Sequence, residues 1–216
     1  AAMTGTDPEK NFKLRLLIEQ ARQANMPKVN IDRAIEKGSG QLGAEKLVEV
    51  VYEGYAPEGV AVIVEAVTDN RNRTTGEIKH VLSRHNGSLG NQGSVAWQFQ
   101  TQGIIIIDQS KYDEDTIIAY ALDGGATDVK TEDNSYQIIT SPNNFSKVKD
   151  ILGKNNVETI SSEISKIPKN TEALSEKEAE KALKLYELLD DLDDVQHVYI
   201  NFEIPDALLE KISAEG

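Results

Sequence analysis

Side chains able to do covalent chemistry are scarce in this 216-residue sequence. It has no cysteine, which excludes thiolate nucleophiles, disulfides and cysteine-based zinc sites. His80 and His85 lie five positions apart on one predicted helix, and so about 140° apart around it, a poor geometry for sharing a metal. No motif combines a nucleophile, a base and an orienting group. The sequence therefore predicts a protein that binds rather than catalyses, with no metal and no cofactor.

Two further patterns resemble ligand sites but lack the required context. Residues 38–43 match G-x-G-x-x-G, yet they follow a predicted helix and precede a strand, whereas a dinucleotide fingerprint follows a strand and opens a helix. The acidic pairs at 190–191 and 193–194 lack the alternating ligand spacing of a calcium loop. The first pattern indicates a linker, and the second indicates a solvated helix end.

An arginine pair is the strongest positive signal. Arg71 and Arg73 lie in a predicted loop before a helix, and Thr74 and Glu77 have the spacing of a capping box. The free N–H groups and the dipole of a helix N-terminus attract anions, and guanidinium groups present planar donors that suit phosphate. The pattern predicts a phosphate site. The alternative is that both arginines pair with carboxylates such as Asp69 or Glu65.

Further cations extend this prediction. Lys79 and Arg84 follow on the same predicted helix, and a second basic face combines Lys28, Arg33 and Lys37 on the helix after Pro27. Such side chains supply salt-sensitive affinity for nucleic acid that does not depend on base sequence. The alternative for the second group is an ordinary solvated helix face.

The net charge of −13 is unevenly distributed along the chain. Residues 1–100 contain 12 Lys/Arg and 12 Asp/Glu, whereas residues 101–216 contain 11 and 24. Because local potential decides where a polyanion docks, the first half remains a candidate contact surface for DNA or RNA. The acidic half suits a basic protein partner, through a predicted helix from Ser175 to about Leu192. The longest apolar run, residues 103–107, is far shorter than the ~20 residues that span a bilayer, so we expect a cytoplasmic protein without a membrane partner.

The elements that position these residues follow from hydrophobic spacing. Two helices, the first entered at Asp7–Pro8, form a hairpin; two strands, at 46–55 and 60–68, precede the arginine pair. Alternation of Val95, Trp97 and Phe99 with polar neighbours indicates a half-buried strand before the isoleucine strand. From there the order is βαββαβ, the split ferredoxin-like arrangement, and a long helix and a last strand follow.

Two stretches carry a family resemblance. Residues 25–35, from Asn25-Met26-Pro27 to Ile35, and residues 52–74, from Tyr52-Glu53-Gly54-Tyr55 to the arginine pair, look like the signatures of the YebC/PmpR family. Residues 87–96, residues 192–196 and Asn201-Phe202 extend the likeness over essentially the whole chain. The resemblance implies a helical domain followed by two α+β domains, and a regulator that binds DNA. A mitochondrial relative that activates translation, and bacterial members tied to the ribosome, leave translation as the alternative.

The resemblance also bears on the ends and divisions of the chain. Family members begin with a basic segment that precedes the position matched by Ala1, so we expect a basic contact surface to lie outside this sequence. The expected fold is multidomain α+β, with a helical domain and two ferredoxin-like domains, the third inserted in the second. The expected boundaries are 1–43 for the helical domain, 44–102 with 172–216 for the middle domain, and 103–171 for the inserted one.

Overall fold

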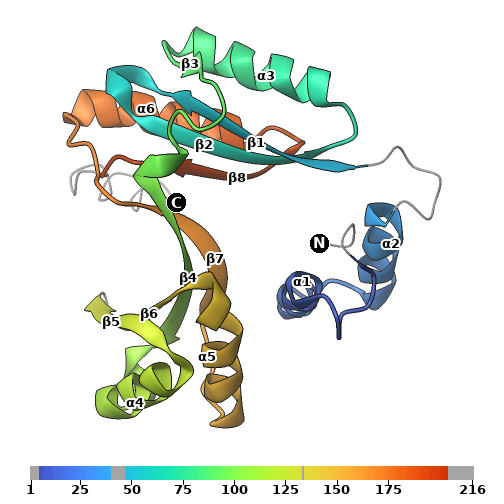
Figure 1. The fold of residues 1–216 in the computed structure, drawn as a ribbon, viewed down its shortest axis with the longest axis vertical. Helices are drawn as coiled ribbons and strands as arrows, with labels where there is room; N and C mark the ends of the chain where they lie inside the picture. Colours follow the sequence, from blue (N-terminus) through green and yellow to red (C-terminus); the bar gives the residue numbers. More distant parts are fainter. Residues whose placement is uncertain (1–4, 40–46, 133, 204–216) are drawn as a thin grey trace. The chain divides into compact units, whose positions relative to one another are not determined.

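The computed structural model describes residues 5–39, 47–132 and 134–203, except for the side chains of Gln23 and Lys37. The described elements are drawn in Figure 1. They form two compact units. The first holds the residues up to Val95 together with Leu174–Ile200, and the second holds Ala96–Ala173 with Asn201–Glu203. The second unit is therefore an insertion in the first. The three domain boundaries predicted from the sequence stay a prediction.

A helical hairpin opens the described chain. Helix α1 spans Phe12–Gln23 and α2 spans Lys28–Gly38. The side chain of Asn11, whose backbone is extended, accepts a hydrogen bond from the Leu14 amide at 3.1 Å and caps α1. The predicted entrance at Asp7–Pro8 is therefore four to five residues too early, because Asn11 supplies the cap. Most of the glycine motif at 38–43 lies outside the described residues.

A four-stranded antiparallel sheet and two helices build the rest of the first unit. The sheet order is β3-β1-β2-β8. The strands are β1 Val48–Tyr55, β2 Ala61–Thr68, β3 Ser88–Leu89 and β8 Val195–Ile200; the helices are α3 Arg71–Arg84 and α6 Glu176–Asp190. A turn through η2, Pro57–Gly59, joins β1 to β2, and Glu58 and Gly59 have positive φ there.

Alternation along the strands sends one set of side chains toward the two helices. Val50 and Tyr52 of β1 are buried, and so are Ile78 and Leu82 of α3. Helix α6 contributes Ala179, Ala182, Leu185 and Leu189 to the same layer. Helices α3 and α6 contact each other and cover the same face of the sheet (Figure 1).

The second unit has the ferredoxin-like order predicted from the sequence. Its antiparallel sheet runs β5-β6-β4-β7, with two crossover helices, α4 and α5, packed against each other. The elements are η3 Ala96–Gln98, β4 Phe99–Asp108, η4 Gln109–Lys111, α4 Glu114–Gly124, β5 Ala126–Glu132, β6 Ser135–Thr140, α5 Pro142–Lys154 and β7 Ser161–Pro168. The predicted α+β fold class is thus confirmed.

The predicted strand through Val95, Trp97 and Phe99 is wrong in its first half. Val95 and Phe99 are buried as expected, but residues 96–98 form the 3-10 turn η3, and Trp97 is 67% exposed. A 3-10 turn has three residues per turn instead of the two-residue alternation of a strand, so it turns the ring outward. The strand begins at Phe99.

Candidate nucleic-acid interface

Helix α3 begins four residues earlier than the capping-box pattern predicted, because its N-cap is Asn70 and not Thr74. Asn70, with φ −137° and ψ 90°, is its N-cap, and its side chain accepts from the Arg73 amide at 3.2 Å. Arg71 and Arg73 therefore lie in the first helical turn rather than in a loop. The hydroxyl of Thr74 bonds back to the Asn70 carbonyl at 3.1 Å, so Thr74 is inside the helix and is not its cap.

Thr74 instead joins a partly buried hydrogen-bond network with Asp194, 120 positions further along the chain. Its hydroxyl donates to the Asp194 carboxylate at 2.6 Å, and the Thr68 hydroxyl donates to the same oxygen at 2.9 Å. Asp194 immediately precedes β8, and its carbonyl accepts from the Val67 amide at 2.8 Å. We call Thr68, Arg73, Thr74 and Asp194 the Asp194 clamp, since these contacts fasten the start of α3 to the start of β8.

Arg73 is the cationic member of the clamp. Its guanidinium donates to Asp194 at 2.8 Å and to Asp69 at 3.0 Å. The hydrogen bond to Asp194 raises the pKa of Arg73. Burial alone would raise the pKa of the Asp194 carboxyl, but the hydrogen bonds from Thr74, Arg73 and Thr68 outweigh it and lower that pKa. The alternative reading of the arginine pair therefore holds for Arg73, whose charge is compensated within the protein.

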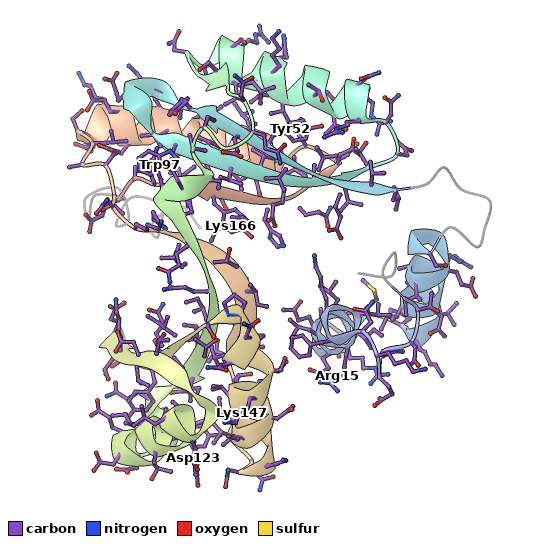
Figure 2. The ribbon with its side chains drawn as sticks, in the orientation of Figure 1. Arg15, Tyr52, Trp97, Asp123, Lys147 and Lys166 are labelled. Atoms are coloured by element: carbon purple, nitrogen blue, oxygen red, sulfur yellow. The ribbon has the colours of Figure 1, made fainter. Side chains whose placement is uncertain are left out.

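Arg71 differs from Arg73 despite being two residues away. Its side chain is exposed, and no carboxylate pairs with it among residues 5–39, 47–132 and 134–203. Its carbonyl is held by the hydroxyls of Thr75 at 2.6 Å and Tyr52 at 3.4 Å. Tyr52, labelled in Figure 2, reaches from β1 to this first turn of α3. The backbone is thus anchored while the guanidinium stays in solvent.

Two more cations lie on the same helix. Lys79 and Arg84 are exposed, and neither forms an ion pair within the described part of the chain. Helix α3 carries four Lys/Arg and a single carboxylate, Glu77. We call Arg71, Lys79 and Arg84 the α3 basic group. These three are the predicted site residues on this helix that are exposed and unpaired in the described structure. Arg71 and Lys79 lie about 80° apart around the helix, whereas Arg84, five residues after Lys79, lies about 140° from it.

The second predicted group lies on α2. Lys28 lines a groove of about 360 Å³ on the helical hairpin, together with Arg22, Asp32 and Glu36. Arg33 is exposed and, five residues on, lies about 140° around the helix from Lys28. Lys28 thus has two acidic neighbours, and Arg33 points to another side. The side chain of Lys37 lies outside the described residues, so the role of this group stays a prediction.

Asp194 is the site residue that the sequence reasoning missed. Its acidic pair was interpreted as a solvated helix end, because nothing local connects it to Arg73, 121 positions away. The only available signal was that residues 192–196 belong to the stretches that carry the family resemblance. In the described ranges no group of three or more His, Cys, Asp or Glu is arranged to hold a metal ion. Among the described helices, none is long and apolar enough to cross a membrane.

The fold and this surface define a multidomain α+β protein with a cationic helix on a two-layer unit and a ferredoxin-like unit inserted in it. The chain belongs to the TACO1/YebC family: the second and third domains of that family match residues 47–202, and its N-terminal domain matches residues 1–41.

Relatives in the family share most of their length with this chain. A protein of Syntrophus aciditrophicus is 47% identical over 99% of this chain and 86% of its own, and one of Dictyoglomus turgidum is 49% identical over 97% and 84%. Both are named "Probable transcriptional regulatory protein". The crystal structure of a conserved hypothetical protein from Aquifex aeolicus is also similar, with a TM-score of 0.84 and 45% identity over 95% of this chain and 85% of that one.

Proposed function

We propose that this chain regulates gene expression by binding DNA, and that the α3 basic group contacts phosphates of the duplex. The observation that carries the proposal is the contrast within α3: Arg73 is compensated by Asp69 and Asp194, whereas Arg71, Lys79 and Arg84 are exposed and unpaired in the described part of the chain. The names of the relatives support a regulator of transcription.

Rigid placement of the cations favours this role over that of an ordinary solvated face. The Asp194 clamp and the Tyr52 hydroxyl hold the first turn of α3, and buried Ile78 and Leu82 hold the rest of the helix against the sheet. Because the backbone of the helix is already ordered, binding to phosphates orders the cationic side chains but no additional backbone. Such contacts position a protein on DNA without reading its bases.

We propose further that the protein acts by binding and not by catalysis. The sequence has no cysteine, and the titratable residues at α3 serve the Asp194 clamp or face solvent. The hydroxyls near the α3 basic group that contact a carboxylate, those of Thr68 and Thr74, are buried in the Asp194 clamp and not presented to a substrate. A broad screen that found sustained substrate turnover by the purified chain would contradict this proposal.

The test is a salt series of DNA binding with charge-reversed variants. Each phosphate contact contributes about 0.9 to the slope of log affinity against log salt. We expect Arg71→Glu/Lys79→Glu/Arg84→Glu to weaken duplex binding and to flatten that slope by roughly 2 to 3. The matched control, Lys147→Glu/Lys149→Glu/Lys154→Glu on α5, changes net charge equally and should retain most of the binding.

The same preparation separates transcription from translation. Duplex DNA, single-stranded RNA and ribosomes are compared at equal salt, with the same two triple variants. Binding of DNA that the α3 variant abolishes supports the proposal. Equal DNA binding by wild type and α3 variant would show that the interface is wrongly placed, and a preference for ribosomes would favour the translational alternative.

A further inference from the structure

The solvent face of α2 carries three side chains that the proposed phosphate contacts of α3 do not involve. Val29, Asn30 and Arg33 are exposed, and Val29 has 65% of its surface open. With 3.6 residues per turn, the three lie within an arc of about 100°, and Arg33 lies about 160° around the helix from buried Ile31. This face, which we call the α2 outer face, therefore points away from the core of the hairpin.

The carboxylates of α2 lie on another side of the helix. Asp32 and Glu36 line the groove of the hairpin, whereas Val29, Asn30 and Arg33 do not. Within the described ranges no carboxylate pairs with Arg33, and the side-chain amide of Asn30 forms no hydrogen bond. The polar groups of the α2 outer face are thus available to a ligand.

A short turn fixes the backbone that carries this face. Residues 24–27 are all that separates α1 from α2. Asn25 has φ 57°, and the Met26 amide donates to the Ala21 carbonyl at 2.9 Å, which closes the end of α1. Two helices joined by a turn of this length are typical of a helix-turn-helix, whose second helix enters the major groove of DNA and places its first residues at base edges.

The three side chains match the edges that base pairs present in the major groove. A guanidinium donates two hydrogen bonds to guanine, a carboxamide pairs with adenine, and an apolar side chain contacts the thymine methyl group. From Val29 to Arg33 the helix rises about 6 Å, which is less than two base-pair steps of about 3.4 Å. The α2 outer face therefore has the chemistry and the length to read neighbouring base pairs.

Charge and composition favour DNA over a protein on this face. Its exposed apolar side chains are Val29 and, in the turn before it, Met26. These are too few for the wide apolar patch in which a protein-docking anchor sits. Residues 1–39 hold seven Lys/Arg against five Asp/Glu, although the whole chain has a net charge of −13. The hairpin is thus a positive part of an acidic protein, and it attracts a polyanion.

We propose that α2 reads base edges in the major groove of duplex DNA, with Arg33 on a guanine, Asn30 on an adenine and Val29 against a thymine methyl group. The inference rests on the proposed function and deepens it. The α3 basic group contacts phosphates of any duplex, whereas the α2 outer face selects the sequence.

Selection from a random library of duplex DNA tests this inference. The full chain is used to enrich bound duplexes, which are then sequenced, and we expect a short shared motif. Changing the base pair that Arg33 reads should weaken binding about five- to 150-fold, the range for one bidentate contact. Binding of an unselected duplex measures the phosphate contacts alone.

Variants that keep the charge separate base reading from phosphate binding. Arg33→Lys retains the cation but loses the planar fork that reaches both guanine acceptors. It should bind an unselected duplex like wild type, and its selected motif should lose the guanine alone. Asn30→Ala should lose the adenine instead. The matched control is Arg22→Lys, in the groove of the hairpin, which should select the wild-type motif. Far-ultraviolet circular dichroism checks that each variant is folded.

The outcomes distinguish this inference from the proposed function. The α3 triple variant should select the same motif with lower affinity. If duplex binding depends on α3 but no motif is enriched, or if both α2 variants select the wild-type motif, base reading by α2 is wrong and the proposed function stands. Unchanged motifs, together with self-association that Val29→Asp abolishes, would assign the face to a second copy of the chain. Absence of duplex binding would remove the inference and the proposed function together.

Discussion

At the scale of single residues, the two arginines of the pair have different roles. Arg73 completes the Asp194 clamp, while Arg71 presents its charge to solvent. A distinctive sequence stretch is thus partly a structural device: Thr68, Arg73 and Thr74 all donate to one carboxylate. Because the acceptor is an ionised carboxylate, these are charge-assisted hydrogen bonds, which are stronger than neutral ones.

The clamp predicts a pH-dependent stability. Because the pKa of Asp194 is lowered by its hydrogen bonds in the folded state, its contribution is present above the unfolded pKa of about 3.9 and is lost as pH falls through the folded value. Asp194→Asn should therefore lower the free energy of unfolding by roughly 1–3 kcal/mol at pH 7. Urea titrations at several pH values should show this deficit shrinking below about pH 4.

The neighbouring Asp193 is the matched control for this prediction. It is exposed and outside the clamp, so Asp193→Asn should unfold like wild type at every pH. A deficit of Asp194→Asn that is the same at pH 3 and pH 7 would show that the side chain acts through packing and not through its charge.

A second prediction separates the two arginines. Arg71→Gln should weaken DNA binding and leave the melting temperature unchanged, because its guanidinium is exposed and unpaired in the described structure. Arg73→Gln should lower the melting temperature, because it leaves Asp194 with fewer donors. Thermal melts and DNA titrations on both variants measure the contrast. Equal losses of affinity at unchanged stability would mean that both arginines face the ligand.

At the scale of elements, the helix pair of the second unit depends on a close approach. Gly124 ends α4 against Val148 of α5, and a Cβ added there would lie 2.5 Å from Val148 Cγ2 and 2.7 Å from Val148 Cα. The backbone of Val148 cannot yield as the tip of a flexible side chain can. The next residue, Gly125, has φ 84° and caps α4 in the left-handed region that favours glycine.

This contact predicts a stability difference between two glycines. Gly124→Ala should destabilise the chain by about 1–3 kcal/mol, the usual cost of overpacking. Gly153→Ala on α5, where an added Cβ meets nothing within 4 Å, should be neutral or stabilising. Denaturant unfolding measures both. Equal stabilities of the two variants would show that α4 and α5 adjust to the added methyl group.

At the scale of the whole molecule, charge is segregated between neighbouring helices. Helices α3 and α6 cover one face of the first sheet and contact each other. Helix α3 is cationic, whereas α6 carries five acids against three lysines. An anionic polymer on α3 therefore lies in the field of α6. The net charge of −13 describes neither helix, because potential at a surface is set by the charges nearest to it.

Replacing acidic residues of α6 by neutral ones tests whether this helix repels DNA. Glu176→Gln/Glu180→Gln/Glu187→Gln should tighten DNA binding several-fold at low salt, because like-charge repulsion is removed. The gain should fade as salt shortens the screening length to about 8 Å at 0.15 M ionic strength. The measurement is a DNA titration over a salt series. If affinity is unchanged at low salt while a basic protein partner is lost, α6 is instead the docking surface for that partner.

The sequence by itself predicted the helices and most of the strands, the ferredoxin-like order, the family and the cations of α3, but it missed β3 and divided β4 into two strands. Helical and strand periodicity depends on residues that are close together in the sequence, so it can be recognised without knowing the fold. Even the boundaries of α3 and β4 needed the structure, because Asn70 competed with Thr74 as a cap and a 3-10 turn replaced a strand at Trp97.

Only the tertiary structure decided which cations are unpaired and able to contact phosphate. Arg71 and Arg73 have the same side chain and nearly the same neighbours in the sequence, and they differ because the fold brings Asp194 from 121 positions away to one of them. Ion pairs over such separations leave no local pattern, since their formation depends on how β8 lies beside β2. The exposure of Trp97 likewise arose from the backbone turn and not from residue type.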